Sequence, residues 1–174
     1  ARLANFGWSP DERMMSFTQT TATGVEVWVL DIAAATAKRV TQTGANANLG
    51  RPMAWFADSK SMLVKMLPTD RQPLIDTKTA VPTGPTVTVS SGAKAQNRTY
   101  QDLLKTPVDE QNFEQLARAE IFKVGVDGSV SNWMQAGMYR GMSFSPDGQY
   151  VMITRTKQPF SYLVPYYRFA FETN

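Results

Sequence analysis

The sequence of 174 residues contains no cysteine and no histidine. Without cysteine, the chain has no disulfide, no thiolate metal ligand and no cysteine nucleophile. Without histidine, it has neither the imidazole base of a Ser-His-Asp or Cys-His site nor a histidine metal ligand. These two absences exclude the commonest hydrolytic and metal-dependent sites, and we expect neither a metal nor a cofactor.

Charge imbalance and long apolar runs are also lacking. The 18 basic and 15 acidic side chains leave a formal charge of +3, which does not favour a nucleic-acid partner. No apolar run has the length of a membrane span. Hydrophobic residues make up 43% of the chain and charged residues 19%, which is typical of a globular domain with a core of its own.

Catalytic motifs are equally scarce. Residues 141–145, Gly-Met-Ser-Phe-Ser, come near the Gly-x-Ser-x-Gly nucleophile elbow but lack its last glycine and precede a hairpin instead of a helix. No glycine-rich phosphate loop is present, and the acidic residues are scattered as on a solvated surface. A small enzyme with a carboxylate site is therefore the least favoured alternative, and no catalytic residue is assigned.

What the sequence does contain is a repeated turn signature. Residues 145–148, Ser-Pro-Asp-Gly, have the residue types of a short hairpin turn that ends in a glycine bulge. Residues 8–11 and 55–58 carry related versions, each with an aromatic residue followed three residues later by aspartate. The first two copies are 47 residues apart and the last two 89. We expect the aromatic residues Trp8, Trp55 and Phe144 to occupy equivalent positions.

A strand, turn and strand repeated at a period in the forties is typical of β-propeller blades. We therefore predict an all-β fold, a partial β-propeller of about two four-stranded antiparallel blades and the start of a third. The predicted blades are residues 1–45, residues 46–136 with an insertion at 68–118, and an incomplete blade at 137–174. Three similar hairpins in an ordinary β-sandwich are the alternative.

Local patterns place the individual elements. In the insertion, residues 86–89 suggest a strand and 99–104 a short helical turn. A helix should follow Thr106, a credible N-cap with proline next to it and Asp109 three residues on. The predicted strands are residues 2–8, 13–18, 25–31, 38–42, 51–56, 61–67, 119–126, 129–134, 138–145, 149–156 and 162–173.

Two longer motifs resemble a known family. Residues 97–105, Asn-Arg-Thr-Tyr-Gln-Asp-Leu-Leu-Lys, and 159–169, Pro-Phe-Ser-Tyr-Leu-Val-Pro-Tyr-Tyr-Arg-Phe, are similar to propeller segments of glutamyl endopeptidases of the prolyl oligopeptidase family. Residues 8–11 and 25–31 also match, so the resemblance covers essentially the whole chain. It implies a non-catalytic propeller that gates and positions peptide substrates for a C-terminal α/β-hydrolase domain, in which the catalytic triad lies.

The same resemblance implies an exported or organellar serine peptidase as the parent protein, and we expect it to be periplasmic or secreted. The chain begins with Ala1 and shows no signal peptide, so we expect an internal fragment or a processed product, without the hydrolase domain and without peptidase activity. Uncovered blade faces would favour self-association. The alternative is a stand-alone periplasmic propeller-like module for protein interactions, because fold alone does not determine function.

The order of the strands predicts which end of the domain meets the substrate. The turns at Asp11, Asp58 and Asp147 should share one end, and the connections at 68–118 and 157–167 should share the other, which we expect to face the hydrolase domain. Guanidinium groups there could pair bidentately with an acidic substrate side chain. The predicted substrate-facing residues are Arg168, ranked first because aromatics surround it, and Arg98, Arg155, Lys157 and Tyr166. Ordinary solvated or strand-pairing charges are the alternative for each.

Overall fold

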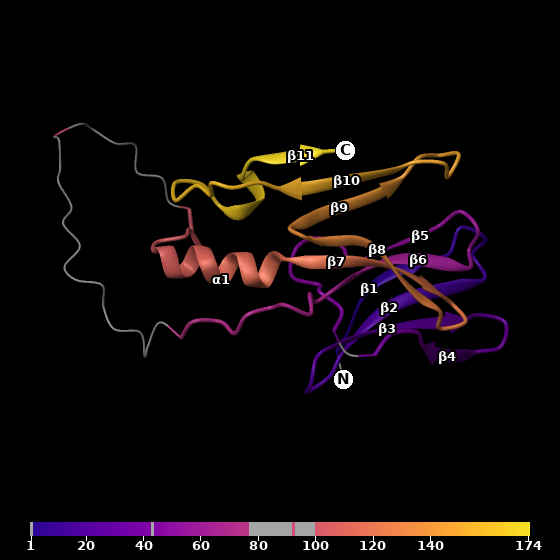
Figure 1. Ribbon diagram of the computed structural model, residues 1–174. Helices are drawn as coiled ribbons and strands as arrows, with labels where there is room; N and C mark the ends of the chain where they lie inside the picture. The colour runs from indigo at the N-terminus through magenta and orange to yellow at the C-terminus, as the bar shows by residue number, and fades with distance from the viewer. Residues whose placement is uncertain (1, 43, 77–91, 93–99) are drawn as a thin grey trace.

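The computed structural model describes residues 2–42, 44–76, 92 and 100–174 (Figure 1). Its elements are β1 (Arg2–Trp8), β2 (Met14–Thr20), β3 (Val25–Asp31), β4 (Thr36–Arg39), β5 (Met53–Trp55), β6 (Ser61–Met66), α1 (Pro107–Ala117), β7 (Ala119–Gly125), β8 (Val130–Gly137), β9 (Tyr139–Phe144), β10 (Val151–Thr156), the 3₁₀ helix η1 (Tyr166–Arg168) and β11 (Phe171–Thr173). The strands form three antiparallel sheets in the orders β1-β2-β3-β4, β5-β6-β7-β8 and β11-β10-β9. The predicted fold class, a partial β-propeller, is confirmed.

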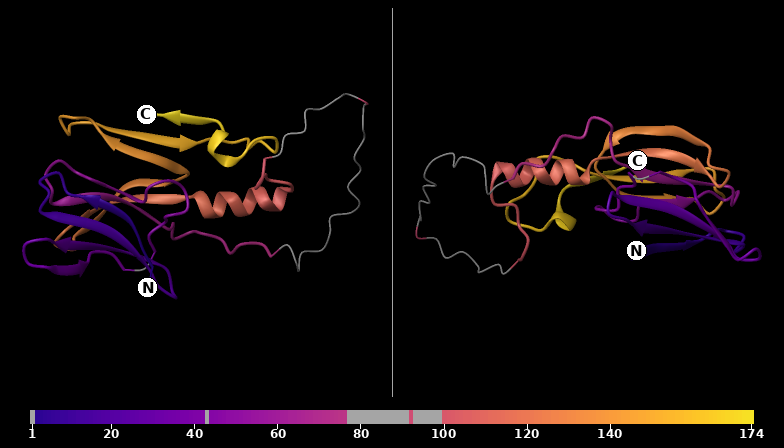
Figure 2. Two further views of the ribbon diagram at one scale, coloured as in Figure 1. Left: turned by 180° about the vertical axis from the view of Figure 1, so that it is seen from behind. Right: turned by 90° about the horizontal axis from the view of Figure 1, so that it is seen from below.

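The three sheets lie side by side in chain order, with the second between the other two (Figures 1 and 2). Apolar side chains fill both spaces between the sheets, as burial of apolar surface requires. The cluster between the first and second sheets includes Val27, Val29, Met53, Met62, Val64 and Val124. The cluster between the second and third sheets includes Leu63, Ile121, Tyr139 and Ile153.

Each sheet begins with the same hairpin. The predicted aromatic residue is the last residue of the first strand in every sheet, and it pairs with the residue seven positions further along the chain. The pairs are Trp8 with Met15, Trp55 with Met62, and Phe144 with Val151. The predicted equivalence of the three aromatic residues is therefore confirmed.

The aspartate turns also share one geometry. In each turn, a carboxylate oxygen accepts a hydrogen bond from the backbone N–H two residues on, and the residue between has positive φ. These residues are Glu12 (φ 59°), Ser59 (55°) and Gly148 (69°). The hydroxyls of Ser9 and Ser145 lower the pKa values of Asp11 and Asp147, respectively, because they donate to the ionised carboxylates.

The helix forms where the sequence predicts it. Thr106 is the N-cap of α1, and its hydroxyl accepts from the Asp109 N–H at 3.2 Å, while the Asp109 carboxylate accepts from the Thr106 N–H at 3.0 Å. This reciprocal capping box satisfies two backbone donors at the start of the helix. At 11 residues, α1 is too short to cross a bilayer, and no helix of the described segments has the length and apolar character of a membrane span.

Several local predictions are wrong. No helical turn forms over residues 100–104, where Asp102 has a φ of 60° that a right-handed helix does not allow. The strand predicted at 162–173 is reduced to β11, because Pro165 lacks a backbone donor and a 3₁₀ turn follows it. The β4 strand begins and ends earlier than predicted. The strand predicted at 86–89 lies outside the described residues.

Candidate functional site

The two long connections lie at one end of the molecule and the aspartate turns at the other, as predicted (Figure 1). The connection between β6 and β7 carries α1, and residues 157–170 connect β10 with β11. The Tyr162 hydroxyl donates to the Glu110 carboxylate of α1 at 2.8 Å, which joins the two connections directly. We call the part of the molecule formed by α1 and residues 157–170 the connection end.

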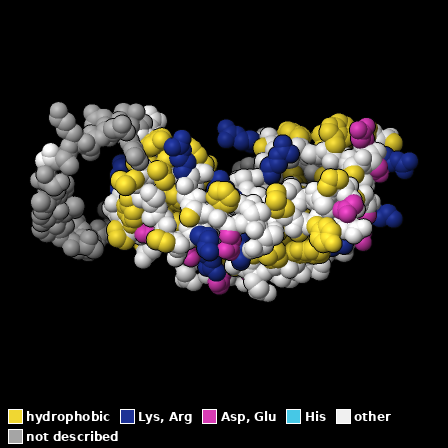
Figure 3. Space-filling model, turned by 90° about the horizontal axis from the view of Figure 1, so that it is seen from above, with side chains coloured by type: hydrophobic (Ala, Val, Ile, Leu, Met, Phe, Trp, Pro, Cys, Tyr) yellow, Lys and Arg dark blue, Asp and Glu magenta, His cyan; other side chains and the backbone are white. Residues whose placement is uncertain are grey.

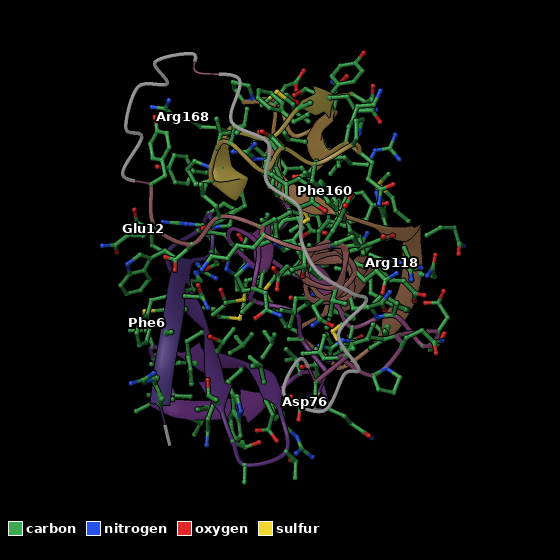
Figure 4. All side chains as sticks on the ribbon, turned by 90° about the vertical axis from the view of Figure 1, so that its left-hand side faces the viewer. Phe6, Glu12, Asp76, Arg118, Phe160 and Arg168 are labelled. Atoms are coloured by element: carbon green, nitrogen blue, oxygen red, sulfur yellow. The ribbon has the colours of Figure 1, made fainter. Side chains whose placement is uncertain are left out.

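An aromatic cluster forms the centre of the connection end. Phe113 of α1 meets Phe160 and Phe169 edge to face, with ring centroids 5.0 and 5.4 Å apart. Phe160 and Phe169 stack on each other at 5.3 Å, and both are buried (Figure 4 labels Phe160). Such geometries are the favoured ones for aromatic pairs, so this cluster fixes residues 157–170 against the helix.

Beside this cluster lies a pocket of about 230 Å³. Its lining residues come from three separate segments, the loop before β5, the helix α1 and the 3₁₀ helix η1. They are Asn48, Leu49, Phe113, Leu116, Ala117 and Tyr166. Five of these six are predominantly apolar, and among the described lining residues Asn48 alone has a side-chain amide.

Two asparagines attach the pocket loop to the end of α1. The Asn46 Nδ2 donates to the carbonyl oxygens of Leu116 (3.0 Å) and Arg118 (2.7 Å), and the Asn48 Nδ2 donates to Leu116 at 3.1 Å. Carbonyl groups in the last turn of a helix lack partners within the helix. The asparagines supply those partners, and they thereby set the distance between the loop and the helix.

Arg168 and Tyr166, two of the predicted substrate-facing residues, lie on η1 at this site. Tyr166 is 47% exposed and lines the pocket. The exposed Arg168 donates from Nη1 to the Tyr100 hydroxyl at 2.9 Å, and its guanidinium carbon lies 5.4 Å from the Tyr100 ring centroid (Figure 4). The sequence placed Arg168 among aromatic residues; its side chain is exposed and its aromatic partner is Tyr100.

The other predicted residues do not join this group. The Arg155 guanidinium and the Lys157 ammonium both pair with the Glu172 carboxylate, at 2.6 and 3.0 Å, and they lower the pKa of Glu172, the Lys157 hydrogen bond most strongly. Arg155 and Glu172 are directly opposite each other on β10 and β11, so this pair is a cross-strand ion pair. Arg98 lies outside the described residues.

The structure adds a basic residue that the sequence did not single out. Arg140 of β9 donates from Nη2 to the Tyr167 carbonyl at 3.0 Å, and its guanidinium lies over the Phe171 ring at 5.0 Å. Its Nη1 is buried without a hydrogen-bond partner among the described residues. Arg168 therefore belongs to η1, and Arg140 contacts it. Within the described part of the chain, neither guanidinium group forms an ion pair.

A fully buried lysine, Lys65, binds the backbone of a residue that lines the pocket. The Lys65 ammonium donates to the carbonyl oxygens of Leu49, a pocket residue, and of Tyr139, the latter at 3.2 Å. Lys65 is 2% exposed, and burial lowers its pKa to about 8. The only signal in the sequence was its position inside the apolar run of β6, where both faces of the strand are covered by neighbouring sheets.

The connection end offers binding groups without a catalytic pair. The face seen in Figure 3 has hydrophobic side chains gathered over the connection end, with basic side chains among them. Across the described ranges, no three histidine, cysteine, aspartate or glutamate side chains gather as metal ligands would. The chain also lacks the histidine base of a nucleophilic site, so this arrangement can hold a ligand but supplies no general base of that kind.

Comparison with known proteins gives two curated relatives. The chain is 30% identical over 179 residues to a probable chloroplastic glutamyl endopeptidase of Oryza sativa subsp. japonica, which covers 97% of the chain and 19% of that protein. It is 28% identical over 172 residues to the probable chloroplastic glutamyl endopeptidase of Arabidopsis thaliana, with 93% and 18% coverage. The chain thus spans less than a fifth of the length of these relatives. No family profile matches it.

Two solved structures from Pyrococcus species illustrate the similarity in fold. An uncomplexed acylaminoacyl peptidase of Pyrococcus horikoshii aligns with a TM-score of 0.49 at 13% identity, over 97% of the chain and 23% of the peptidase. The β-propeller domain of the Trilobed protease from Pyrococcus furiosus aligns with a TM-score of 0.32 at 12% identity, over 92% of the chain and 51% of that domain.

Proposed function

We propose that this chain, whose predicted resemblance to glutamyl endopeptidases is confirmed by its two plant relatives, is a non-catalytic section of the propeller of a serine peptidase of the prolyl oligopeptidase family. The observation that carries this proposal is the sequence similarity over 97% of the chain. In such a parent, the triad would lie in a C-terminal α/β-hydrolase domain, and the present chain would gate and position peptide substrates.

The connection end is the part of the chain that we propose to face the hydrolase domain. Function commonly sits on elaborated loops that a rigid scaffold holds in place, and both long connections of this propeller section meet there. Arg168 is exposed and fixed by Tyr100, so its guanidinium is oriented before any ligand arrives. We therefore propose that Arg168 pairs with an acidic side chain of the substrate, with Tyr166 beside it.

The two other described basic residues, the cellular location and self-association are part of the same proposal. Arg155 and Lys157 are engaged with Glu172, which makes them weaker candidates for substrate contact than Arg168. A periplasmic or secreted location stays a prediction, and the two plant relatives are described as chloroplastic. Self-association of the chain through its uncovered sheet faces is also proposed.

A chimeric enzyme tests the role of Arg168. The segment of the rice glutamyl endopeptidase that matches this chain is replaced by the chain, and kcat/KM is measured for paired peptides with Glu or Gln before the cleaved bond. Because a hydrogen bond to a charged group contributes about 1.5–3 kcal/mol, Arg168→Met should lower the Glu-to-Gln ratio by about tenfold or more.

Arg39→Met is the matched control for this experiment. Arg39 is a similarly accessible arginine that pairs with Glu26 on the first sheet, away from the connection end. Its replacement should leave the Glu-to-Gln ratio unchanged. If Arg168→Met also leaves the ratio unchanged, Arg168 is a structural residue and takes no part in recognition.

A stand-alone interaction module is the second candidate function. Exposed aromatic residues on β1, Phe6 (52% exposed) and Trp8 (57%), favour it because large exposed apolar side chains often mark interaction surfaces (Figure 4 labels Phe6). A folded chimera that hydrolyses no peptide, together with specific binding of a protein partner to the isolated chain, would favour this second function.

A further inference from the structure

The size of the pocket at the connection end limits what it can hold. Its volume of about 230 Å³ exceeds that of an engineered cavity of about 150 Å³ that binds benzene. It is smaller than the pockets of about 300–1,000 Å³ that enclose drug-sized ligands. The pocket therefore has room for a single side chain or a group of similar size.

The walls of the pocket are fixed in the absence of any ligand. Phe113 is held by the buried aromatic residues Phe160 and Phe169, and Asn48 is bonded to the carbonyl of Leu116. The backbone of Leu49 accepts from the buried Lys65. A site whose walls are already ordered loses little conformational entropy when a ligand enters.

The chemistry of the walls and of the neighbouring η1 residue Arg168 identifies the occupant. Phe113 and Tyr166 present aromatic rings, and Leu116 and Ala117 complete an apolar wall, which suits an aromatic side chain. The exposed Arg168 guanidinium lies two residues from Tyr166 on η1, and it forms no ion pair within the described residues. A peptide that carries both a ring and a carboxylate is complementary to this apolar pocket and to a cation on the same short helix, η1.

We propose that this pocket binds an aromatic side chain of a peptide substrate and that Arg168 binds a carboxylate of the same peptide. The inference rests on the proposed function, because that function supplies the peptide. It adds a second determinant of specificity, namely an apolar subsite on the propeller at the connection end.

The test is a titration of the isotope-labelled chain with three capped peptides, acetyl-Phe-Glu-Gly-amide, acetyl-Ala-Glu-Gly-amide and acetyl-Phe-Gln-Gly-amide. Binding is followed by NMR through the methyl groups of Leu49, Leu116 and Ala117, all of which line the pocket. The Phe-Glu peptide should bind at least about tenfold more tightly than the Ala-Glu peptide, because it buries the ring. It should also bind about tenfold more tightly than the Phe-Gln peptide, because its Glu carboxylate can pair with the Arg168 guanidinium.

Two variants change the pocket in different ways. Ala117→Met fills it, and because Ala117 is buried, the fold of this variant is checked by its NMR spectrum. Tyr166→Ala removes an exposed wall whose ring lies 6.3 Å from that of Phe113, and the fold of this variant is checked in the same way. Each variant should bind the Phe-Glu peptide at least about tenfold more weakly and bind the Ala-Glu peptide with unchanged affinity. Tyr150→Ala, at the opposite end of the third sheet and 72% exposed, should change neither.

Three results would overturn the proposal: equal affinity for the Phe-Glu and Ala-Glu peptides, ligand-induced shifts away from the pocket methyl groups, or no binding of any peptide at millimolar concentration. Failure of the pocket proposal can be distinguished from failure of the proposed function. If the two peptides bind equally while the Glu-to-Gln ratio of the chimera still depends on Arg168, the pocket proposal fails and the proposed function stands.

Discussion

Lys65 allows a quantitative test of how tightly the second and third sheets pack. Its side chain is 2% exposed, and its ammonium donates to the carbonyl groups of Leu49 and Tyr139. Burial lowers its pKa from 10.5 to about 8. Between these two pH values the unfolded chain holds a proton that the folded chain has released. The free energy of unfolding should therefore rise as pH rises from about 8 to 10.5.

The magnitude follows from the same two values. A difference between 10.5 and about 8 corresponds to about 3 kcal/mol at 1.36 kcal/mol per pKa unit. Below pH 8, the folded state bears this full cost of the buried charge, and above pH 10.5 it bears none. Because the carbonyl acceptors favour the charged form, about 3 kcal/mol is the upper value of the effect.

The assay is urea unfolding of the natural chain and of Lys65→Met at a series of pH values from 7 to 11. The free energy of unfolding of the natural chain minus that of the variant should increase by up to about 3 kcal/mol over this range. Lys60→Met, at an exposed lysine, is the control for the loss of one positive charge. A difference for Lys65→Met that stays constant over the pH range would refute the reasoning.

Three further outcomes can be measured on the isolated chain. Gly148→Ala should lower the free energy of unfolding by about 1–2 kcal/mol, because φ is 69° and the new Cβ would lie 2.8 Å from that of Ala57. Gly128→Ala, also at positive φ but in open space, should lower the free energy of unfolding by less. An equal decrease would show that the contact with Ala57 adds nothing at position 148. Thr106→Ala should cost about 1 kcal/mol through loss of the cap, measured by urea unfolding; no loss would contradict the capping role. Trp8→Ser should reduce self-association in sedimentation velocity, whereas an unchanged sedimentation profile would remove this aromatic residue from the interface.

The parts of the fold that the sequence predicted are those determined by local chemistry. The hairpins at Asp11, Asp58 and Asp147 depend on turn residues adjacent in the chain, and the cap at Thr106 depends on Asp109. Both kinds of feature were placed correctly because the donor and acceptor groups lie within five residues of each other.

The failures depend on contacts between distant segments. Residues 157–170 pack on α1 through Phe160 and Phe169, and this packing replaced most of a strand that the local pattern favoured. Similarly, no short window of sequence indicates that Lys65 is buried, because its partners at Leu49 and Tyr139 are 16 and 74 residues away.

The candidate site was predicted only in outline. The prediction that both long connections share one end was correct, and it brought Tyr166 and Arg168 to the right region. The pocket itself could not be predicted, because its walls come from three segments separated in the chain. Arg155 and Lys157 were assigned to the substrate from their charge and from their place at the end with the long connections, whereas their ion pairs with Glu172 depend on the register of β10 and β11.

The central claim is that this chain is a non-catalytic section of a peptidase propeller. The most direct test measures the hydrolysis of a Glu-containing peptide by the isolated chain and by the rice chimera. The account predicts no hydrolysis by the purified chain, which lacks histidine, and Glu-dependent hydrolysis by the chimera. Hydrolysis by the purified chain alone, or a folded chimera without activity, would contradict it.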